Sequence, residues 1–195
     1  MKFVGSGKMS ILSIVTIDLK YITFEHSVLR QRSCEISLRE SKSLELCKKI
    51  ALDMFEIMYT TYGAALSAPQ VGIPLRLIVI DPAKLDFGPH VLINPIMVYK
   101  ADSEEADMER CLSLPDYAGR VFRSNRVRVS AYNLNGQREE YEAEGLLARI
   151  FQHELDHLDG ILYCDRLQPE DNLVESERAA RRKAVEAISS SQGII

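Results

Sequence analysis

The sequence has few features of secreted, membrane-bound or nucleic-acid-binding proteins. Its formal net charge is −4, from 24 Lys and Arg against 28 Asp and Glu, so no excess of positive charge attracts nucleic acid or an anionic membrane. No apolar run approaches the roughly 20 residues that span a bilayer. Residues 1–15 lack the continuous apolar core and the small-residue cleavage site of a signal peptide. We therefore expect a cytoplasmic protein with no membrane partner and no direct nucleic-acid binding.

Cysteine is also scarce. The four cysteines, Cys34, Cys47, Cys111 and Cys164, form no CxxC pair and no dense framework. In a reducing compartment each is expected to be a buried thiol, unless its neighbours indicate a metal ligand or a nucleophile.

The length and composition suit one globular domain. The chain has 195 residues, of which 46% are hydrophobic, so it can bury a core of its own. We expect a flexible appendage over residues 1–9, a single catalytic domain over residues 10–188, and a flexible tail over residues 189–195.

Hydrophobic periodicity predicts three helices and several strands. The helices are expected at 41–59, 145–159 and 170–187, the last of them rich in charge. The strands are expected at 10–17, 75–81, 91–94, 96–99, 126–132 and 137–141, with a turn at 133–136 joining the last two. This order predicts an α+β fold with mostly antiparallel sheets around the 145–159 helix, and with an N-terminal and a C-terminal helix.

The central helix contains the motif HExxH, as His153, Glu154 and His157. Residues four apart lie one above the other on a helix, so both imidazoles can reach one divalent ion. Chance copies of this short motif occur on charged surface helices. Here, however, Leu146 and Ile150 lie on the same stripe as the histidines, so the imidazoles are expected beside an apolar surface, where a metal supplies the partner they need. The pattern indicates a metal site.

A catalytic site of this kind needs a third protein ligand and an open position for water. Glu175 and Glu177 lie about 20 residues further on, as the glutamate ligand does in thermolysin-type metallopeptidases. Cys111, within Glu109–Pro115, is the other candidate. Spacing alone leaves both open.

At these residues the sequence resembles the peptide deformylases, which remove the formyl group from the initiating methionine of new chains. The three motifs of that family are GxGxAAxQ, EGCLS and QHExDHxxG. They correspond in order to Gly63–Gln70, Glu109–Ser113 and Gln152–Gly160. The third motif is complete, and the likeness covers roughly residues 26 to 170.

The resemblance implies that Cys111, His153 and His157 are the metal ligands. It implies Fe(II) as the native ion, with Zn, Ni or Co able to occupy the same site. A thiolate beside two imidazoles is in keeping with Fe(II) or Zn rather than with Mg or Ca.

The resemblance also implies the catalytic roles. Glu154 is the general base and later the acid, while the side-chain amide of Gln70 and the backbone N–H of Leu112 donate to the formyl oxygen. This chemistry is sound, because a bound divalent ion lowers the pKa of its water from about 15.7 to about 7. Negative charge then develops on the carbonyl oxygen, which needs donors fixed in advance. Glu154 can carry the water proton to the leaving amine.

Four positions depart from the family pattern. In the first motif, Ala65 replaces the second Gly and Ser67 replaces the first Ala. In the second motif, Arg110 replaces the Gly. Arg149 stands where relatives often carry an apolar residue that lines the methionine pocket. The substrate-binding residues are then expected to be Gly63, Ala65, Arg110, Leu146 and Ile150. Because the departures concern binding, we expect an active enzyme with altered peptide preference.

Several residues have more than one interpretation. Asp156 either orients a histidine or faces solvent, Glu109 either supports the site or is a surface charge, and Gln70 could also cap a turn. His26 and His90 are expected to be ordinary surface or turn residues.

The leading hypothesis is an enzyme that acts on N-formylmethionyl peptides, with transient ribosome contact through the charged 170–187 helix. The second is an HExxH metallopeptidase with a glutamate third ligand. The third is a deformylase-like metal-binding protein that Ala65 and Arg110 have impaired.

Overall fold

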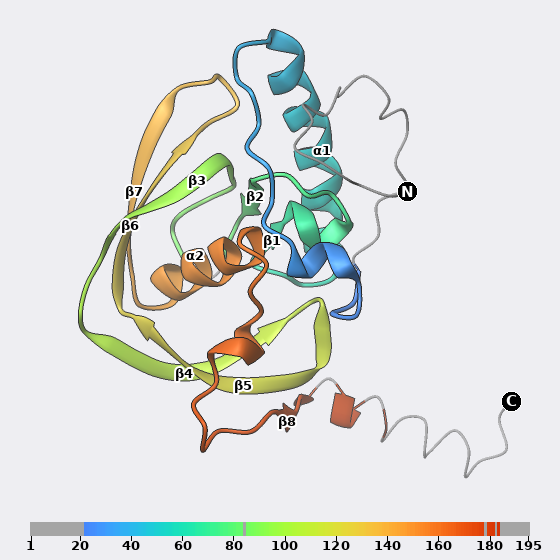
Figure 1. The fold of residues 1–195 in the computed structure, drawn as a ribbon, viewed down its shortest axis with the longest axis vertical. Coiled ribbons are helices and arrows are strands. Elements are labelled where there is room, and N and C mark those ends of the chain that lie inside the picture. Colours follow the sequence, from blue (N-terminus) through green and yellow to red (C-terminus); the bar gives the residue numbers. More distant parts are fainter. Residues whose placement is uncertain (1–21, 84, 178, 182, 184–195) are drawn as a thin grey trace, which may run out of the picture.

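The molecule consists of two antiparallel sheets with a helix between them (Figure 1). The computed structural model describes residues 22–83, 85–177, 179–181 and 183. The larger sheet has the order β1 (Ala65–Ser67), β2 (Leu77–Ile80), β3 (His90–Lys100), β6 (Arg126–Tyr132) and β7 (Arg138–Glu144). The smaller sheet has the order β4 (Glu104–Cys111), β5 (Leu114–Ser124) and β8 (Val174–Glu175). The expected α+β class is confirmed.

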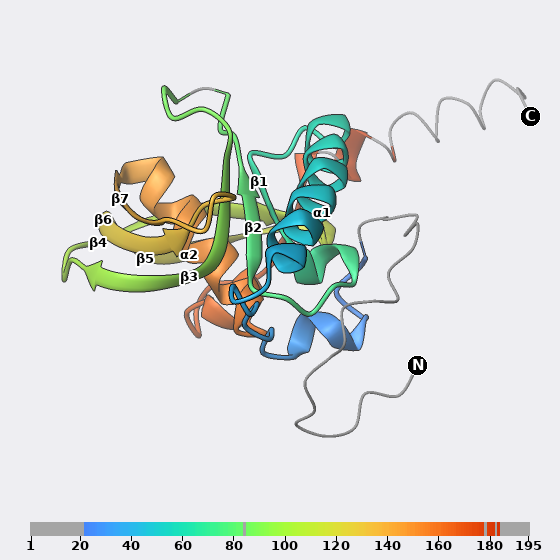
Figure 2. The ribbon, with the colours of Figure 1, turned by 90° about the horizontal axis from the view of Figure 1, so that it is seen from above.

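Helices cover both faces of the first strands of the larger sheet. The helices are α1 (Ser41–Thr60) and α2 (Gly145–Leu158), with short 3-10 helices η2 (Ser27–Arg30), η3 (Ala68–Val71) and η4 (Tyr163–Arg166). Figure 2 shows α1 and α2 on opposite sides of β1 and β2. Strand β2 explains this arrangement, because its four residues LIVI are all buried. Leu77 and Val79 face the core under α1, whereas Ile78 and Ile80 face the core under α2, as the two-residue period of a strand requires.

Helix α2 is fixed in place by its apolar stripe. Phe151, Leu155 and Leu158 pack with Val129 and Tyr141 of the larger sheet in one buried cluster. Their spacing along the helix is that of an amphipathic face, and α2 begins and ends within one residue of the predicted bounds. The opposite side of α2 is therefore free to present His153 and Glu154 to the smaller sheet.

The hairpin of β4 and β5 was missed by the sequence analysis. Five successive residues of β4, from Glu104 to Met108, are exposed, so the strand shows no apolar alternation. Its pairing with β5 runs from Glu104 opposite Ser124 to Arg110 opposite Ala118, and the register shifts between Arg110 and Cys111. The shift ends the ladder at Cys111, which turns toward α2 as a buried residue.

The predicted start of the third helix is wrong. Within residues 170–176, Val174 and Glu175 form strand β8, which pairs with Tyr117 and Ala118 of β5. The backbone of β8 hydrogen-bonds to the edge of β5 that would otherwise be open. In this part of the chain, the described helical residues begin only at Glu177. The predicted strand at 10–17, the appendage at 1–9 and the tail at 189–195 lie outside the described residues.

The cysteines differ in exposure. Cys47 is buried, as expected, and burial raises the pKa of its thiol to about 11. Cys164 is half-buried, and Cys34 is exposed, so the expectation of a buried thiol is wrong for Cys34. Cys34 lies in an isolated bridge with Leu75 rather than in a core element.

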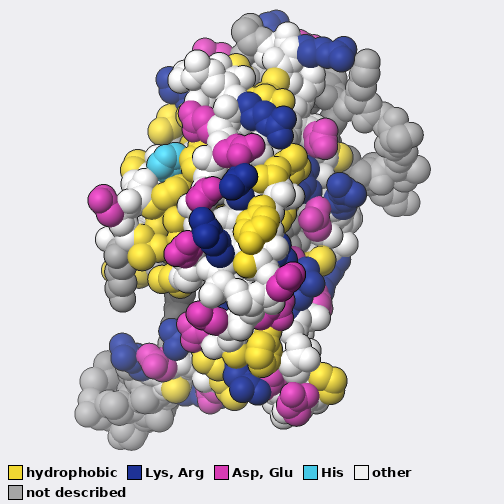
Figure 3. Space-filling view, turned by 90° about the vertical axis from the view of Figure 1, so that its left-hand side faces the viewer, with side chains coloured by type: hydrophobic (Ala, Val, Ile, Leu, Met, Phe, Trp, Pro, Cys, Tyr) yellow, Lys and Arg dark blue, Asp and Glu magenta, His cyan; other side chains and the backbone are white. Residues whose placement is uncertain are grey.

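The surface carries charges of both signs. Figure 3 shows Lys and Arg side chains interspersed with Asp and Glu on the face that it views. Arg126 and Arg128, for example, both pair with exposed Glu142 across β6 and β7. Among the described residues, no helix is both long enough and apolar enough to cross a bilayer.

A glycine holds the end of α2 against η2. Gly160 has φ +78°, and a Cβ there would lie 2.9 Å from the carbonyl carbon of Arg30. Gly72 has a similar φ of +81°, but a Cβ added there would have no heavy atom within 4 Å. We expect Gly160→Ala to lower the free energy of unfolding by about 2–3 kcal/mol, since it adds a backbone clash to left-handed strain. Gly72→Ala should cost about 1 kcal/mol, from the strain alone.

Urea denaturation of the two variants and the wild type measures both losses. Equal losses at Gly160 and Gly72 would show that the contact with Arg30 contributes nothing.

Candidate metal centre

Cys111, His153 and His157 converge at one point between β4 and α2. The ligand atoms of the three side chains all lie within 4.8 Å of one another. Cys111 Sγ is 3.2 Å from His157 Nε2, and the two imidazole rings are 4.9 Å apart, centroid to centroid. The histidines meet because they are four residues apart on α2, and the cysteine joins them because the β4–β5 ladder ends at that residue.

This cluster fits a divalent metal ion. A tetrahedral ion with bonds of about 2.0–2.3 Å holds its ligand atoms on the order of 3.5 Å apart. His153 Nδ1 is hydrogen-bonded to Glu109, at 2.9 Å, so its Nε2 is left for an ion. His157 Nδ1 is buried and has no hydrogen-bond partner among the described residues. One thiolate and two imidazoles form a donor set that suits Fe(II) or Zn.

The surroundings favour a thiolate at Cys111. Burial alone would raise the pKa of the thiol, but the neighbouring His157 and His153 outweigh it and hold that pKa well below its usual value. Because the thiolate is the form that binds metal, the site is preorganised for a metal ligand.

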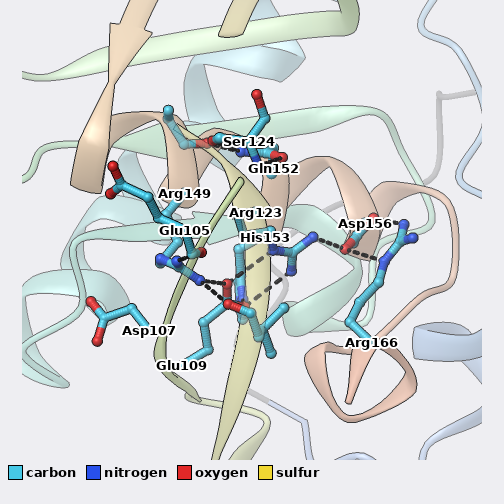
Figure 4. A network of polar contacts seen from close by, with 12 residues as sticks. Glu105, Asp107, Glu109, Arg123, Ser124, Arg149, Gln152, His153, Asp156 and Arg166 are labelled. Carbon is cyan, nitrogen blue, oxygen red and sulfur yellow. Dashed lines mark hydrogen bonds and ion pairs between the residues drawn. The ribbon is translucent and has the colours of Figure 1, made fainter. Parts of the chain in front are cut away.

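Glu109 orients His153 from the centre of a buried ionic network (Figure 4). Arg123 donates from Nε and Nη2 to the two carboxylate oxygens, at 2.9 and 3.0 Å, and Arg149 donates from Nη1 at 2.9 Å. Burial would raise the pKa of Glu109, yet the hydrogen bonds from His153 and Arg123 lower it far below its usual value. Glu109 is therefore an ionised support of the site and not a surface charge.

Asp156 extends this network away from the metal cluster. Its carboxylate accepts from Arg123 and from Arg166, and it is only 8% exposed. Neither interpretation of Asp156 from the sequence was right. It orients a guanidinium, not a histidine, and it does not face solvent.

Arg149 is placed by the same network. Its guanidinium donates to the carbonyls of Val121 and Glu105 as well as to Glu109, and the residue is 8% exposed. The charge is thus drawn into the protein, although the side chain still lines the cleft beside Leu146 and Ile150.

Glu154 lies beside the cluster with one carboxylate oxygen unpaired. Its Oε2 atom is buried and has no hydrogen-bond partner in the described part of the chain. Burial, the largest influence, raises the pKa of its carboxyl above the usual value, while the nearby histidines oppose it. A buried carboxyl with a raised pKa and a free oxygen is suited to exchange protons.

The two ends of the Gln70 side chain have different neighbours. Its Oε1 accepts from Ser67 N at 2.8 Å and from Ser67 Oγ at 2.9 Å, which caps η3. The cap leaves Nε2 pointing at the metal cluster, 3.5 Å from Cys111 Sγ. The capping interaction therefore fixes the direction of the donor. Ser67, one of the departures from the family pattern, supplies this anchoring hydroxyl.

A cleft of about 540 Å³ opens onto the cluster. Cys111, His153, Glu154, Gln70 and Leu112 line it. The residues that were predicted to bind substrate line it as well: Gly63, Ala65, Arg110, Leu146 and Ile150. His157 lies behind them, 1% exposed.

The two glutamates that compete for the third ligand position are engaged elsewhere. Glu175 pairs with Lys183 at 2.7 Å, and Glu177 lies 3.7 Å from Arg110 on the exposed rim of the cleft. Neither belongs to the cluster of possible ligands found among the described residues.

Two residues of the site were missed by the sequence analysis. Arg123 is buried on β5 beneath Glu109, and the ring of Tyr163 stacks on His153 with centroids 6.2 Å apart. Arg123 carries no local signal, because it lies in a strand that the apolar pattern did not reveal. Tyr163 follows the third motif closely and could have been found from its position there.

Comparisons with known proteins agree with this geometry. The sequence model described as polypeptide deformylase matches residues 19–173. A peptide deformylase of Pseudothermotoga lettingae is 38% identical over 167 residues, which cover 85% of this chain and 89% of the relative. One of Brucella suis is 43% identical over 122 residues, 62% of this chain and 70% of the relative.

Solved structures show the same similarity. The peptide deformylase of Thermotoga maritima matches with a TM-score of 0.71 at 38% identity, covering 77% of this chain and 98% of that one. The enzyme of Synechococcus elongatus in complex with actinonin matches with a TM-score of 0.71 at 39% identity, covering 78% and 82%.

The network around Glu109 should contribute strongly to stability. We expect Arg123→Met to lower the free energy of unfolding by about 3–5 kcal/mol, because it leaves two buried carboxylates without their shared partner. Arg128→Met is a matched control, since Arg128 pairs with Glu142 on the surface and should change stability far less. Denaturant unfolding of both variants measures the difference. Similar small losses for the two would contradict the importance of this network.

Proposed function

Because the chain belongs to the polypeptide deformylase family, whose members are metal-dependent hydrolases, we propose that it removes the formyl group from N-formylmethionyl peptides by hydrolysis. One observation carries the proposal: a thiol and two imidazoles converge beside a buried carboxyl that has one unpaired oxygen, at the floor of a cleft. The cleft has room for an extended peptide end.

Cys111, His153 and His157 would hold one divalent ion. When bound, such an ion lowers the pKa of a coordinated water from about 15.7 to about 7 and so supplies a nucleophile at neutral pH. Fe(II) is the native ion in this proposal, and Zn, Ni and Co are compatible with the same donor set.

Glu154 moves the proton. Its Oε2 has no hydrogen-bond partner among the described residues and the residue lines the cleft, so in this proposal it accepts a proton from the attacking water and then delivers it to the amine that leaves. The burial that raises the pKa of its carboxyl makes the protonated form accessible, which the second transfer requires.

Gln70 and Leu112 stabilise the negative charge on the formyl oxygen. Ser67 holds the amide oxygen of Gln70, so Nε2 is the end that donates to the substrate. Leu112 follows Cys111 directly and lines the cleft, where its backbone N–H is the second donor. The loss of one such donor typically costs about 3–4 kcal/mol in transition-state stabilisation.

Leu146 and Ile150 form the apolar wall for the methionine side chain. Arg149 does not disturb this wall electrostatically, because Glu109 and two carbonyls satisfy its guanidinium. The formylated residue is thus expected to bind beside α2, and the rest of the peptide leaves along the rim.

The proposal also places the enzyme in the cytoplasm, in transient contact with the ribosome. The substrate is a new chain, and all four cysteines are free, as a reducing compartment would keep them. We expect Arg181→Glu together with Lys183→Glu to reduce co-sedimentation with ribosomes at low salt, since reversing two charges disrupts the electrostatic complementarity of a contact made through them. Equal co-sedimentation of wild type and variant would exclude ribosome contact through Arg181 and Lys183.

The reaction is tested by release of formate from formyl-Met-Ala-Ser. We expect turnover by the metal-replete wild type, and a loss of about 10²–10⁴-fold in Glu154→Ala, since a positioned proton-transfer group contributes roughly that factor. Metal content should not change in Glu154→Ala, because Glu154 is not a ligand, and it should fall in Cys111→Ala.

Other outcomes would favour the rival functions. Metal that is retained in Cys111→Ala but lost in Glu177→Ala would indicate a metallopeptidase. A folded, metal-loaded wild type that turns over no formylated peptide would indicate an impaired, deformylase-like protein.

A further inference from the structure

Helix α1 ends in a strained turn at the mouth of the cleft. The Tyr62 N–H donates to the Tyr59 carbonyl at 3.2 Å, and the Gly63 N–H donates to the Met58 carbonyl at 2.8 Å. These two bonds are those of a Schellman cap, whose first residue beyond the helix adopts the left-handed conformation. That residue is Tyr62, with φ +60°.

Tyrosine is an unfavourable choice at this position. The left-handed residue of a Schellman cap is usually Gly and sometimes Asn, because the Cβ of other residues crowds the backbone. A bulky side chain there is an outlier. Strained residues of this kind concentrate at functional sites, where binding rather than folding accounts for them.

The Tyr62 ring has no structural role that would explain the strain. Tyr62 is 97% exposed, so its ring packs against almost nothing in the described protein. Tyr59, one turn earlier, is different: its hydroxyl donates to Asp81, and its ring stacks on Phe55.

Tyr62 nevertheless lies at the edge of the cleft. Tyr62 lines it immediately before Gly63, the first residue of the first motif. Met108 and Leu146, which also line the cleft, are 44% and 51% exposed, so other parts of the rim are apolar as well. The charges of Arg110 and Glu177 lie close together on that rim and offset each other.

We propose that Tyr62 is a specificity-determining residue whose ring packs against the side chain of a peptide residue downstream of the formylmethionine, and that it favours a large apolar or aromatic side chain there. The inference rests on the proposed function for the identity of the ligand. An apolar side chain lying between the ring and the rest of the rim would be removed from water on both sides, which an exposed ring alone cannot achieve.

Equilibrium binding tests this contact independently of turnover. The probe is a dye-labelled formyl-Met peptide with Ala at the next three positions, compared with peptides that carry Phe or Lys at one of them. Fluorescence anisotropy with metal-replete Glu154→Ala protein gives each Kd while hydrolysis is slowed by about 10²–10⁴-fold. We expect Phe at one position to tighten binding about three- to tenfold over Ala.

Variants in the same background identify the ring. Tyr62→Ala should abolish the preference for Phe, Tyr62→Phe should retain it, and Tyr99→Ala should retain it too. Tyr99 is a matched control, because it is 48% exposed on β3 and does not line the cleft. Tyr62→Gly should lose the preference for Phe while raising Tm by about 2–4 °C through relief of the left-handed strain. A lost preference in a more stable variant shows that the loss comes from the missing ring and not from a destabilised fold.

Three results would overturn the proposal: no gain for Phe at any position, an unchanged gain in Tyr62→Ala, or a gain for Lys alone. Formate release by the wild type is measured beside the binding series. Binding with the expected preference but no formate release from the wild type would refute the proposed function and leave the contact standing. Formate release by the wild type, together with an unchanged preference for Phe in Tyr62→Ala, would support the proposed function and refute the contact with Tyr62.

Discussion

The buried carboxylate of Glu109 is the constraint on which the site depends. It lies on β4, two residues before Cys111, and its partners come from β5 and from α2. A buried carboxylate without partners would be strongly destabilising, so the strand and the helix are held at the distance at which the arginines and His153 reach it. That same distance brings Cys111 to the histidines. The geometry of the candidate metal ligands thus follows from the ion pairs around Glu109.

The polar groups around the floor of the cleft differ in how much of their hydrogen-bonding capacity is already used. Arg149 and Asp156 are fully engaged with partners that lie away from the cleft. Gln70 is engaged through its oxygen alone, which leaves its nitrogen directed at the site. Glu154 keeps one oxygen without a partner. The groups that the proposed function assigns to the substrate are the ones with unused hydrogen-bonding capacity, and their positions are set by neighbours that have none.

The sequence predicted the parts of this design that depend on local spacing. The two helices with apolar stripes, the hairpin of β6 and β7, and the pairing of His153 with His157 all follow from periods of 3.6 or 2. The β4–β5 hairpin could not be predicted in this way, because the exposed residues of β4 show no alternation. Arg123 could not be found either, since an ion pair between residues 109 and 123 leaves no periodic signal. Strand β8 depends on the free edge of β5, a tertiary feature that overrides the helical pattern.

The floor and the rim of the cleft are therefore built on different principles. On the floor, Cys111, His153 and Glu154 are almost completely buried or closely packed, and the proposed function assigns the chemical step to them. The departures from the family pattern at Ala65 and Arg110 lie instead in the walls and the rim, as does the left-handed Tyr62. Contacts made there act on parts of the peptide that do not react, so they change which peptides bind and leave the transition state itself to the floor. Because the rim groups contribute little to folding, substitution of these residues can alter peptide preference at small cost in stability, whereas substitution around Glu109 cannot.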